Sequence, residues 1–460
     1  MRRLAGAVAG AAVAGLIWWL PAFDGLAQTG RATASVLALG AVFWAAEVLN
    51  TGVTALLVLG LLLCAGVPAS TALSGFGSPA WWILVSVLYL GTAMERSGLA
   101  RRLAYRILLL FRPTYGGILS AFCAIGFVLM IGIPSMTVRT AIMVPIAWAL
   151  VQALPLERPG RGAALIVFTA FEMAVLPGTA LLTGALWGPY IAGLFASSGI
   201  ALSWLEYARI MALPTLAWCA LVVAGNRLAL SPRSTVLPHR ELLRAEMAGL
   251  GPPKSAELAT AGVVSVSVLA WASQPWHRLP AEAIGMLAFV ALFALGVLKP
   301  ADIGSGIPWP LAIFVGGMLG LTQAITAYGI NKSLAALVVP ALEPFTHNAF
   351  AFVIALGAAI AVIRLIEPGG FITIAAFFLA LLGAATPLSR APLALAGAIL
   401  LPVHVFWFSY QNIWMVMTDG ITAGKAYSTA DRLRFAAVFF VATLAALLLA
   451  AAYWRWLGVL

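Results

Sequence analysis

A short polar segment at 134–139 contains the residues of this chain best suited to bind a ligand. It reads Pro-Ser-Met-Thr-Val-Arg and separates two long apolar runs. Irregular backbone inside a hydrocarbon layer is tolerated only where it lines a cavity or a binding site. If a helix begins near Ser135, its free N–H groups, the hydroxyl of Thr137 and the guanidinium of Arg139 suit carboxylate or sulfate oxygens.

A second break, at 367–373, reads Glu-Pro-Gly-Gly-Phe-Ile-Thr and would expose another helix start. The two breaks together predict an anion site, and a purely structural ion pair is the alternative. The predicted substrate-binding residues are Ser135, Met136, Thr137, Arg139, Pro368, Gly369, Gly370 and Thr373.

Two acidic residues within apolar stretches leave alternatives open. Glu172 lies in an apolar stretch and could form either a helix–helix hydrogen bond or an ion pair with Arg139. Arg364 and Glu367 are three residues apart and share one helix face, so they either neutralise each other or serve the site.

The composition is that of an integral membrane protein. The chain has 460 residues, of which 63% are hydrophobic and 9% charged, against about 25% charged in soluble domains. Its apolar stretches are about 17–25 residues long, which is the length of a membrane-spanning helix. We therefore predict an all-α polytopic protein with roughly eleven transmembrane helices and two re-entrant hairpins.

The net charge of +11 does not indicate a nucleic-acid partner. The basic residues concentrate in two loops, 95–112 and 227–254, and the positive-inside rule places both loops, with the N-terminus, on the cytoplasmic side of an inner membrane. The N-terminal apolar run is interpreted as a retained helix, with a cleaved signal peptide as the alternative. The lipid bilayer is the expected environment.

Enzyme motifs are missing from the sequence. It has no His/Glu metal signature, nucleophile elbow or P-loop, and its three cysteines lie singly in apolar stretches, so we expect neither an enzyme nor a metal site. No cofactor is expected, and Na⁺ as a coupling ion is left open.

Weak internal similarities predict a duplicated fold. Ser203, Glu206 and Arg209 are matched 225 residues later by Ser428, Asp431 and Arg434. Gly98-Leu99 is matched by Gly329-Ile330 after 231 residues, and Pro134-Ser135 by Pro368-Gly369 after 234. Duplicated membrane proteins with paired broken helices are commonly secondary transporters. The expected division is N-terminal scaffold helices at 1–75, a first repeat at 76–230, a cytoplasmic connector at 231–256, linking scaffold helices at 257–300 and a second repeat at 301–460.

Several motifs in order resemble the divalent anion:sodium symporter family of di- and tricarboxylate and sulfate carriers. They are Trp44-Ala45-Ala46-Glu47, Glu95-Arg96-Ser97-Gly98-Leu99, Ser203-Trp204-Leu205-Glu206-Tyr207 and Ile307-Pro308-Trp309 with Gly316-Gly317. The resemblance implies inverted repeats, a homodimer and an elevator-type movement of the site across the bilayer.

The chain departs from the family pattern at the hairpin tips. Ser135-Met136-Thr137 stands where the resemblance implies Ser-Asn-Thr, and 368–370 keeps none of those side chains. Thr183, Gly184 and Asn412 are the nearest matches to residues that help hold sodium in the family. Because both Asn copies are lost and Arg139 is gained, we hypothesise that the fixed charge of Arg139 replaces one bound cation, which puts sodium coupling in doubt.

These observations favour a secondary active transporter of a small dianion: a dicarboxylate, a tricarboxylate or sulfate. Two rivals remain open: a cation/proton antiporter or metalloid exporter, with Glu172 or Glu367 as its proton-binding group, and a transport-inactive sensor subunit. Substrate identity and direction of transport do not follow from the sequence.

Overall fold

The structure, a computed structural model, describes residues 2–23, 25–46, 48–230, 240–365, 370–384 and 386–460. All regular structure within these ranges is helical, which confirms the predicted all-α class. Among the described residues, seven helices are long and apolar enough to cross a membrane, and they span Tyr115–Gly132, Met136–Ala153, Arg161–Ala180, Trp204–Leu230, Ser255–Ala272, Trp309–Ala327 and Thr429–Trp456. Shorter apolar helices accompany them, so the chain is polytopic.

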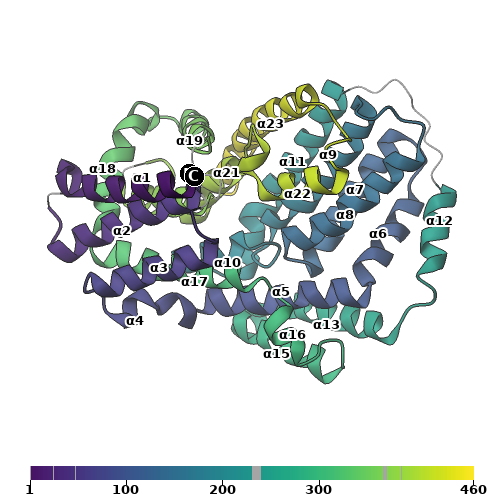
Figure 1. Ribbon diagram of the computed structural model, residues 1–460, viewed down its shortest axis with the longest axis horizontal. Helices are drawn as coiled ribbons and strands as arrows, with labels where there is room; N and C mark the ends of the chain where they lie inside the picture. Colours follow the sequence, from purple (N-terminus) through teal and green to yellow (C-terminus); the bar gives the residue numbers. More distant parts are fainter. Residues whose placement is uncertain (1, 24, 47, 231–239, 366–369, 385) are drawn as a thin grey trace.

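The N-terminal helices form one end of the molecule (Figure 1). They are α1 (Arg2–Leu16), α2 (Gln28–Ala45), α3 (Thr51–Cys64) and the short α4 (Ala69–Ala72). Asn50 caps α3 by accepting a hydrogen bond from the backbone N–H of Gly52, 3.0 Å away. At Gly52 the helix touches the backbone of Pro310, where an added Cβ would lie 2.8 Å away. The glycine therefore allows α3 to approach the second half of the chain closely.

Two series of helices follow the same order along the chain. The first comprises α5 (Pro79–Ser97), α6 (Leu99–Leu110), α7 (Tyr115–Gly132), α8 (Met136–Ala153), α9 (Arg161–Val175), the 3₁₀ turn η4 (Leu176–Ala180), α10 (Trp187–Ser197) and α11 (Trp204–Leu230). The second comprises α17 (Trp309–Ala327), α18 (Ile330–Leu342), α19 (Ala349–Ile363), α20 (Phe371–Leu382), α21 (Pro392–Val403), the 3₁₀ turn η6 (Ser409–Gln411), α22 (Ile413–Thr422) and α23 (Thr429–Trp456).

Matching local geometry accompanies this matching order. Gly98 joins α5 to α6 at φ +85°, and Gly329 joins α17 to α18 at φ +74°, both in the left-handed region that favours glycine. Ser203 and Ser428 each accept a hydrogen bond, of 3.1 Å, from the backbone N–H three residues later. The weak sequence similarities therefore coincide with equivalent helix junctions.

The long helices α11 and α23 pack against each other in the middle of the molecule (Figure 1). Trp218 Nε1 donates to Thr443 Oγ1 at 2.9 Å, and Trp454 Nε1 donates to the carbonyl oxygen of Ile210 at 3.0 Å. Both tryptophans are fully buried. Each indole finds the polar partner that its burial requires, so the last helices of the two series are fastened together.

Along the chain, five helices separate the two series: α12 (Arg240–Gly249), α13 (Ser255–Ala272), α14 (Gln274–His277), α15 (Ala281–Ala294) and α16 (Ala301–Ser305). The short amphipathic helix expected in the connector is present as α12, and residues 231–239 lie outside the described part. Buried Arg102 on α6 pairs with Glu257 on α13, and Arg96 pairs with Asp302 on α16. The Asp302 carboxylate also accepts a hydrogen bond from the backbone N–H of Lys299, at 2.8 Å.

Candidate functional site

The predicted break at 134–139 is present, and α8 begins immediately after it. Pro134 has no N–H to continue α7, and Ser135 caps α8 by accepting a hydrogen bond at 3.3 Å from the backbone N–H of Val138. Ser135 and Met136 are buried, whereas Thr137 is exposed. Of the residues at this helix start, Thr137 is therefore the one that presents a hydroxyl to a ligand.

The start of α22, in the second series, meets the start of α8. Asn412 caps α22, because its Oδ1 accepts hydrogen bonds from the backbone N–H groups of Trp414 at 3.1 Å and Met415 at 3.2 Å. Trp414 Nε1 then donates to Thr137 Oγ1 at 3.1 Å. Two helix N-termini from different halves of the chain thus converge, and both ends carry positive partial charge.

The start of α20 has an equivalent partner in the first series. Gly370 precedes α20 at φ +77°. Tyr190 on α10 donates its Oη–H to the carbonyl oxygen of Phe371 at 2.9 Å, and the rings of Trp187 and Phe371 lie 4.6 Å apart. Thr373 is buried in the first turn of α20. Glu367, Pro368 and Gly369 lie outside the described residues, as does Glu47, so the structure describes Gly370 and Thr373 alone of the predicted residues here.

Arg139 is fully buried, and backbone carbonyl groups surround its guanidinium. Its Nε donates to the oxygen of Ala174 at 2.6 Å, and its Nη1 donates to the oxygens of Ile133 at 2.6 Å and Gly184 at 2.7 Å. Nη2 is buried without a hydrogen-bond partner and faces Gly178. No ion pair joins Arg139 to a carboxylate within the described ranges.

Glu172 adopts the first of its two predicted alternatives, the helix–helix hydrogen bond. Asn226 on α11 donates its Nδ2–H to Glu172 Oε1, and both side chains are fully buried. The second oxygen of Glu172 and the Oδ1 of Asn226 have no partner. Glu172 therefore ties α9 to α11, although it is only two residues from the carbonyl group that accepts from Arg139.

The residues predicted to hold sodium have backbone and structural contacts. Thr183 Oγ1 accepts a hydrogen bond from Trp204 Nε1 at 3.0 Å. Gly184 contributes its carbonyl oxygen to Arg139, and Asn412 uses its side chain as a helix cap. The three residues thus lie at the helix breaks, close to the candidate site.

Sequence reasoning missed the partners of these residues: Asn226, Trp414 and Gln411. Gln411 exchanges hydrogen bonds with Arg364, because Arg364 Nη2 donates to the Gln411 carbonyl oxygen at 2.6 Å and Gln411 Nε2 donates to the Arg364 carbonyl oxygen at 2.6 Å. Polar side chains inside apolar stretches are the signal that would have singled out Asn226 and Gln411.

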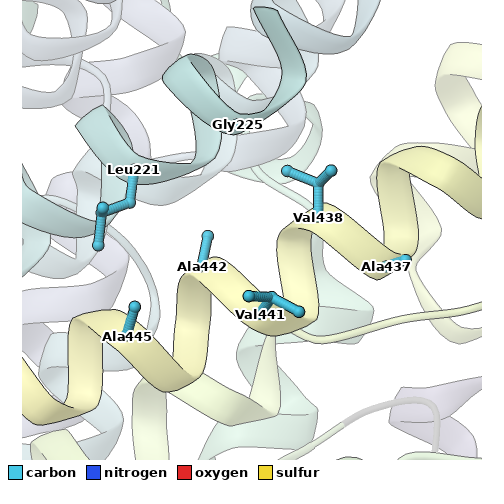
Figure 2. A pocket seen from close by; sticks show the side chains of 7 residues that line it. All are labelled: Leu221, Gly225, Ala437, Val438, Val441, Ala442 and Ala445. Atoms are coloured by element: carbon cyan, nitrogen blue, oxygen red, sulfur yellow. The ribbon is translucent and has the colours of Figure 1, made fainter. Parts of the chain in front are cut away.

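Two hollows in the described part of the molecule have apolar walls. The smaller, of about 300 Å³, lies between α2, the end of α19 and α20, and its lining includes Ile372 and Thr373 at the start of α20. The larger, of about 400 Å³, lies between α11 and α23 and is lined by Leu221, Gly225, Ala437, Val438, Val441, Ala442 and Ala445 (Figure 2). Its aliphatic walls suit lipid chains rather than an anion. The candidate site is therefore the meeting point of the helix starts, with Thr137 exposed there.

The comparisons with known proteins agree with this arrangement. Residues 1–460 match the family described as the sodium:sulfate symporter transmembrane region. The chain is 24% identical to a membrane protein of Cupriavidus necator, over 97% of this chain and 92% of that protein. It is 22% identical to the chloroplastic dicarboxylate transporter 1 of Spinacia oleracea, over 68% of this chain and 57% of the spinach protein.

A solved structure has a similar fold. The YdaH transporter of Alcanivorax borkumensis, whose topology is described as unusual, superposes with a TM-score of 0.57 and 13% identity. The match covers 86% of this chain and 89% of that one. At this identity the likeness concerns the fold alone.

Proposed function

Because the chain belongs to the sodium:sulfate symporter family, we propose that it is a secondary carrier that moves a small dianion across the inner membrane. A dicarboxylate, a tricarboxylate and sulfate are the candidate substrates. The observation that carries the proposal is the convergence of the α8 and α22 starts, joined by the hydrogen bond from Trp414 to Thr137. Two helix N-termini that face one point form a site for anionic oxygens.

Arg139 contributes to this site through its charge and not by touching the substrate. Its guanidinium is directed into the protein, toward three carbonyl groups. It lies less than one helical turn from Thr137, at a depth where burial reduces dielectric screening. A fixed positive charge at that distance stabilises a bound dianion, while the Thr137 hydroxyl and free backbone N–H groups supply the direct contacts.

The proposed movement is that of an elevator in a homodimer. The paired order of α5–α11 and α17–α23 supports two related transport segments. Gly98 and Gly329, both with left-handed backbone, lie at the junctions between a long helix and the following shorter helix. These junctions are the places where each segment would turn relative to its supporting helices.

Uptake of radiolabelled C4-dicarboxylate, citrate and sulfate into proteoliposomes tests the proposal. Thr137→Val should raise the KM for the transported anion about tenfold or more, because a hydrogen bond to a charged group contributes about 1.5–3 kcal/mol. Thr346→Val is the matched control, since that hydroxyl only donates to the carbonyl oxygen of Glu343 in a distant turn. Equal KM values in the two variants would place the anion elsewhere.

The same vesicles separate the rival functions. Flux that follows a pH gradient without any anion would favour the proton antiporter, for which buried Glu172 is the described proton-binding candidate. Anion binding without flux would favour a sensor subunit. Uptake of one of the three radiolabelled anions, abolished by an excess of the same unlabelled anion, would support the proposed carrier function.

A further inference from the structure

The carbonyl groups around Arg139 form a small cage for a cation. The three oxygens come from separate segments: Ile133 from the break before α8, Ala174 from the last turn of α9, and Gly184 from the loop before α10. Each lies 2.6–2.7 Å from a guanidinium nitrogen, and the whole side chain is inaccessible to solvent. The cage is therefore assembled by the fold and not by neighbouring residues of one helix.

Such a cage is chemically suited to a monovalent ion. Carbonyl oxygens at helix breaks coordinate alkali cations in transporters and channels because their dipoles replace the hydration shell. A buried cation is costly unless such groups compensate it, and no described carboxylate pairs with Arg139. The carbonyl dipoles are thus what compensates this charge, as they would for a free ion.

The second series has an arginine at an equivalent carbonyl. Trp187 and Trp414 are 227 residues apart and lie at the starts of α10 and α22, and Gly184 and Gln411 are separated by the same interval. Arg139 donates to the Gly184 oxygen, and Arg364 donates to the Gln411 oxygen. The two arginines come from different positions in their series: Arg139 lies in the first turn of α8, and Arg364 follows the last residue of α19.

We propose that Arg139 acts as a tethered cation that fills a carbonyl site otherwise suited to a free alkali ion. The protein then has this positive charge in place before any solute arrives. Anion binding therefore requires no sodium, and removing the Arg139 side chain opens a monovalent-cation site lined by the oxygens of Ile133, Ala174 and Gly184. The consequence for transport rests on the proposed carrier function, whereas the existence of the cation site does not.

Thermal unfolding of the purified full-length protein in nanodiscs tests the cage directly. NaCl, KCl, methylguanidinium chloride and choline chloride are compared at equal ionic strength. The wild-type melting temperature should not depend on the cation. Arg139→Ala should melt lower and recover by at least about 2 °C, saturably, with Na⁺ or methylguanidinium but not with choline, since a ligand that binds the folded state stabilises it. Arg101→Ala, at an exposed position on α6, is the matched control and should show no such recovery.

Three results would overturn the proposal. They are a saturable sodium-specific rise in the wild type, an Arg139→Ala variant that responds equally to choline, and an Arg101→Ala control that recovers in the same way. If Arg139→Ala does not fold, Arg139→Lys replaces it. An ammonium group still fills the cage, so this variant should melt independently of the cation, and sodium-specific stabilisation would refute the inference.

Transport measurements separate this inference from the proposed function. Anion uptake by wild-type vesicles should differ less than twofold between sodium and choline media. Uptake that depends steeply on sodium would refute the tethered cation and leave the carrier function intact. Absence of all anion flux, with the predicted cation recovery of Arg139→Ala, would refute the carrier and leave the cage intact.

Discussion

Gly178 in the η4 turn gives the sharpest test of how firmly the guanidinium of Arg139 is held. A Cβ added at this position would lie 2.4 Å from Arg139 Nη2, 2.6 Å from the Gly184 oxygen and 2.8 Å from the Cβ of Ala185. Ordinary van der Waals contact begins near 3.4 Å. The Gly178→Ala variant must therefore push the guanidinium or the Gly184 carbonyl aside by about 1 Å.

The energetic effect follows from that displacement. The 2.7 Å hydrogen bond from Arg139 to Gly184, stretched by about 1 Å, leaves the usual N–H···O range of about 2.7–3.2 Å. Overpacking costs about 1–3 kcal/mol, and losing a hydrogen bond to a charged group costs about 1.5–3 kcal/mol. Together they predict about 2.5–6 kcal/mol, or a fall of about 3–6 °C in melting temperature for a chain of this length.

The assay is thermal unfolding of Gly178→Ala beside Gly60→Ala. Gly60 lies on an exposed face of α3, where an added Cβ meets nothing within 4 Å, so this control isolates the intrinsic effect of alanine. In an Arg139→Ala background, Gly178→Ala should cost less, because the clash with Nη2 is gone. Equal melting temperatures for Gly178→Ala and Gly60→Ala would refute a rigid cage.

Two further predictions concern the helix–helix contacts. Glu172→Leu should lower the free energy of unfolding by about 1–3 kcal/mol because it leaves the buried Asn226 amide unpaired, whereas Glu172→Gln keeps an acceptor and should be milder; chemical denaturation of both variants checks the order. Hydrogen bonding from the Lys299 N–H, reinforced by Arg96, holds the pKa of Asp302 below its usual value of 3.8. A carboxyl group with a depressed pKa stabilises the fold above its unfolded-state pKa and loses that contribution as the pH falls through its folded-state value. The melting-temperature gap between wild type and Asp302→Asn should accordingly stay constant from pH 7 to about pH 5 and close below about pH 3.8.

The sequence was sufficient for the features that depend on local chemistry. Composition predicted the all-α membrane class, and Pro134 with Ser135 predicted the helix break, because a missing N–H and a capping hydroxyl act within one turn. The position of Arg139 between two apolar runs also predicted that its charge lies inside the protein. The equivalent helix junctions at Gly98 and Gly329 were detectable because glycine is favoured in left-handed backbone.

Contacts between distant segments could not be predicted in this way. Arg139 was expected to face an anion, but its partners are backbone carbonyl groups. Because every residue has a backbone carbonyl, the residue types of Ile133, Ala174 and Gly184 do not mark these residues as partners of Arg139. For Glu172 the sequence left a helix–helix hydrogen bond and an ion pair with Arg139 as alternatives. The packing of α9 on α11 selects the hydrogen bond, with Asn226 as the donor. The hydrogen bond from Trp414 to Thr137 joins residues 277 positions apart, beyond any periodic pattern.

The exchanged contacts between the two series bear on how such a chain could arise. Trp414 of the second series completes the α8 start, and Tyr190 of the first completes the α20 start. One series alone would lack both partners. A half-length ancestor would therefore have needed a second copy of itself to finish either helix start, and gene fusion would then have made a permanent pair in which each copy could diverge. Arg139 and Arg364, placed differently in their series, are the kind of asymmetry that only the fused chain permits.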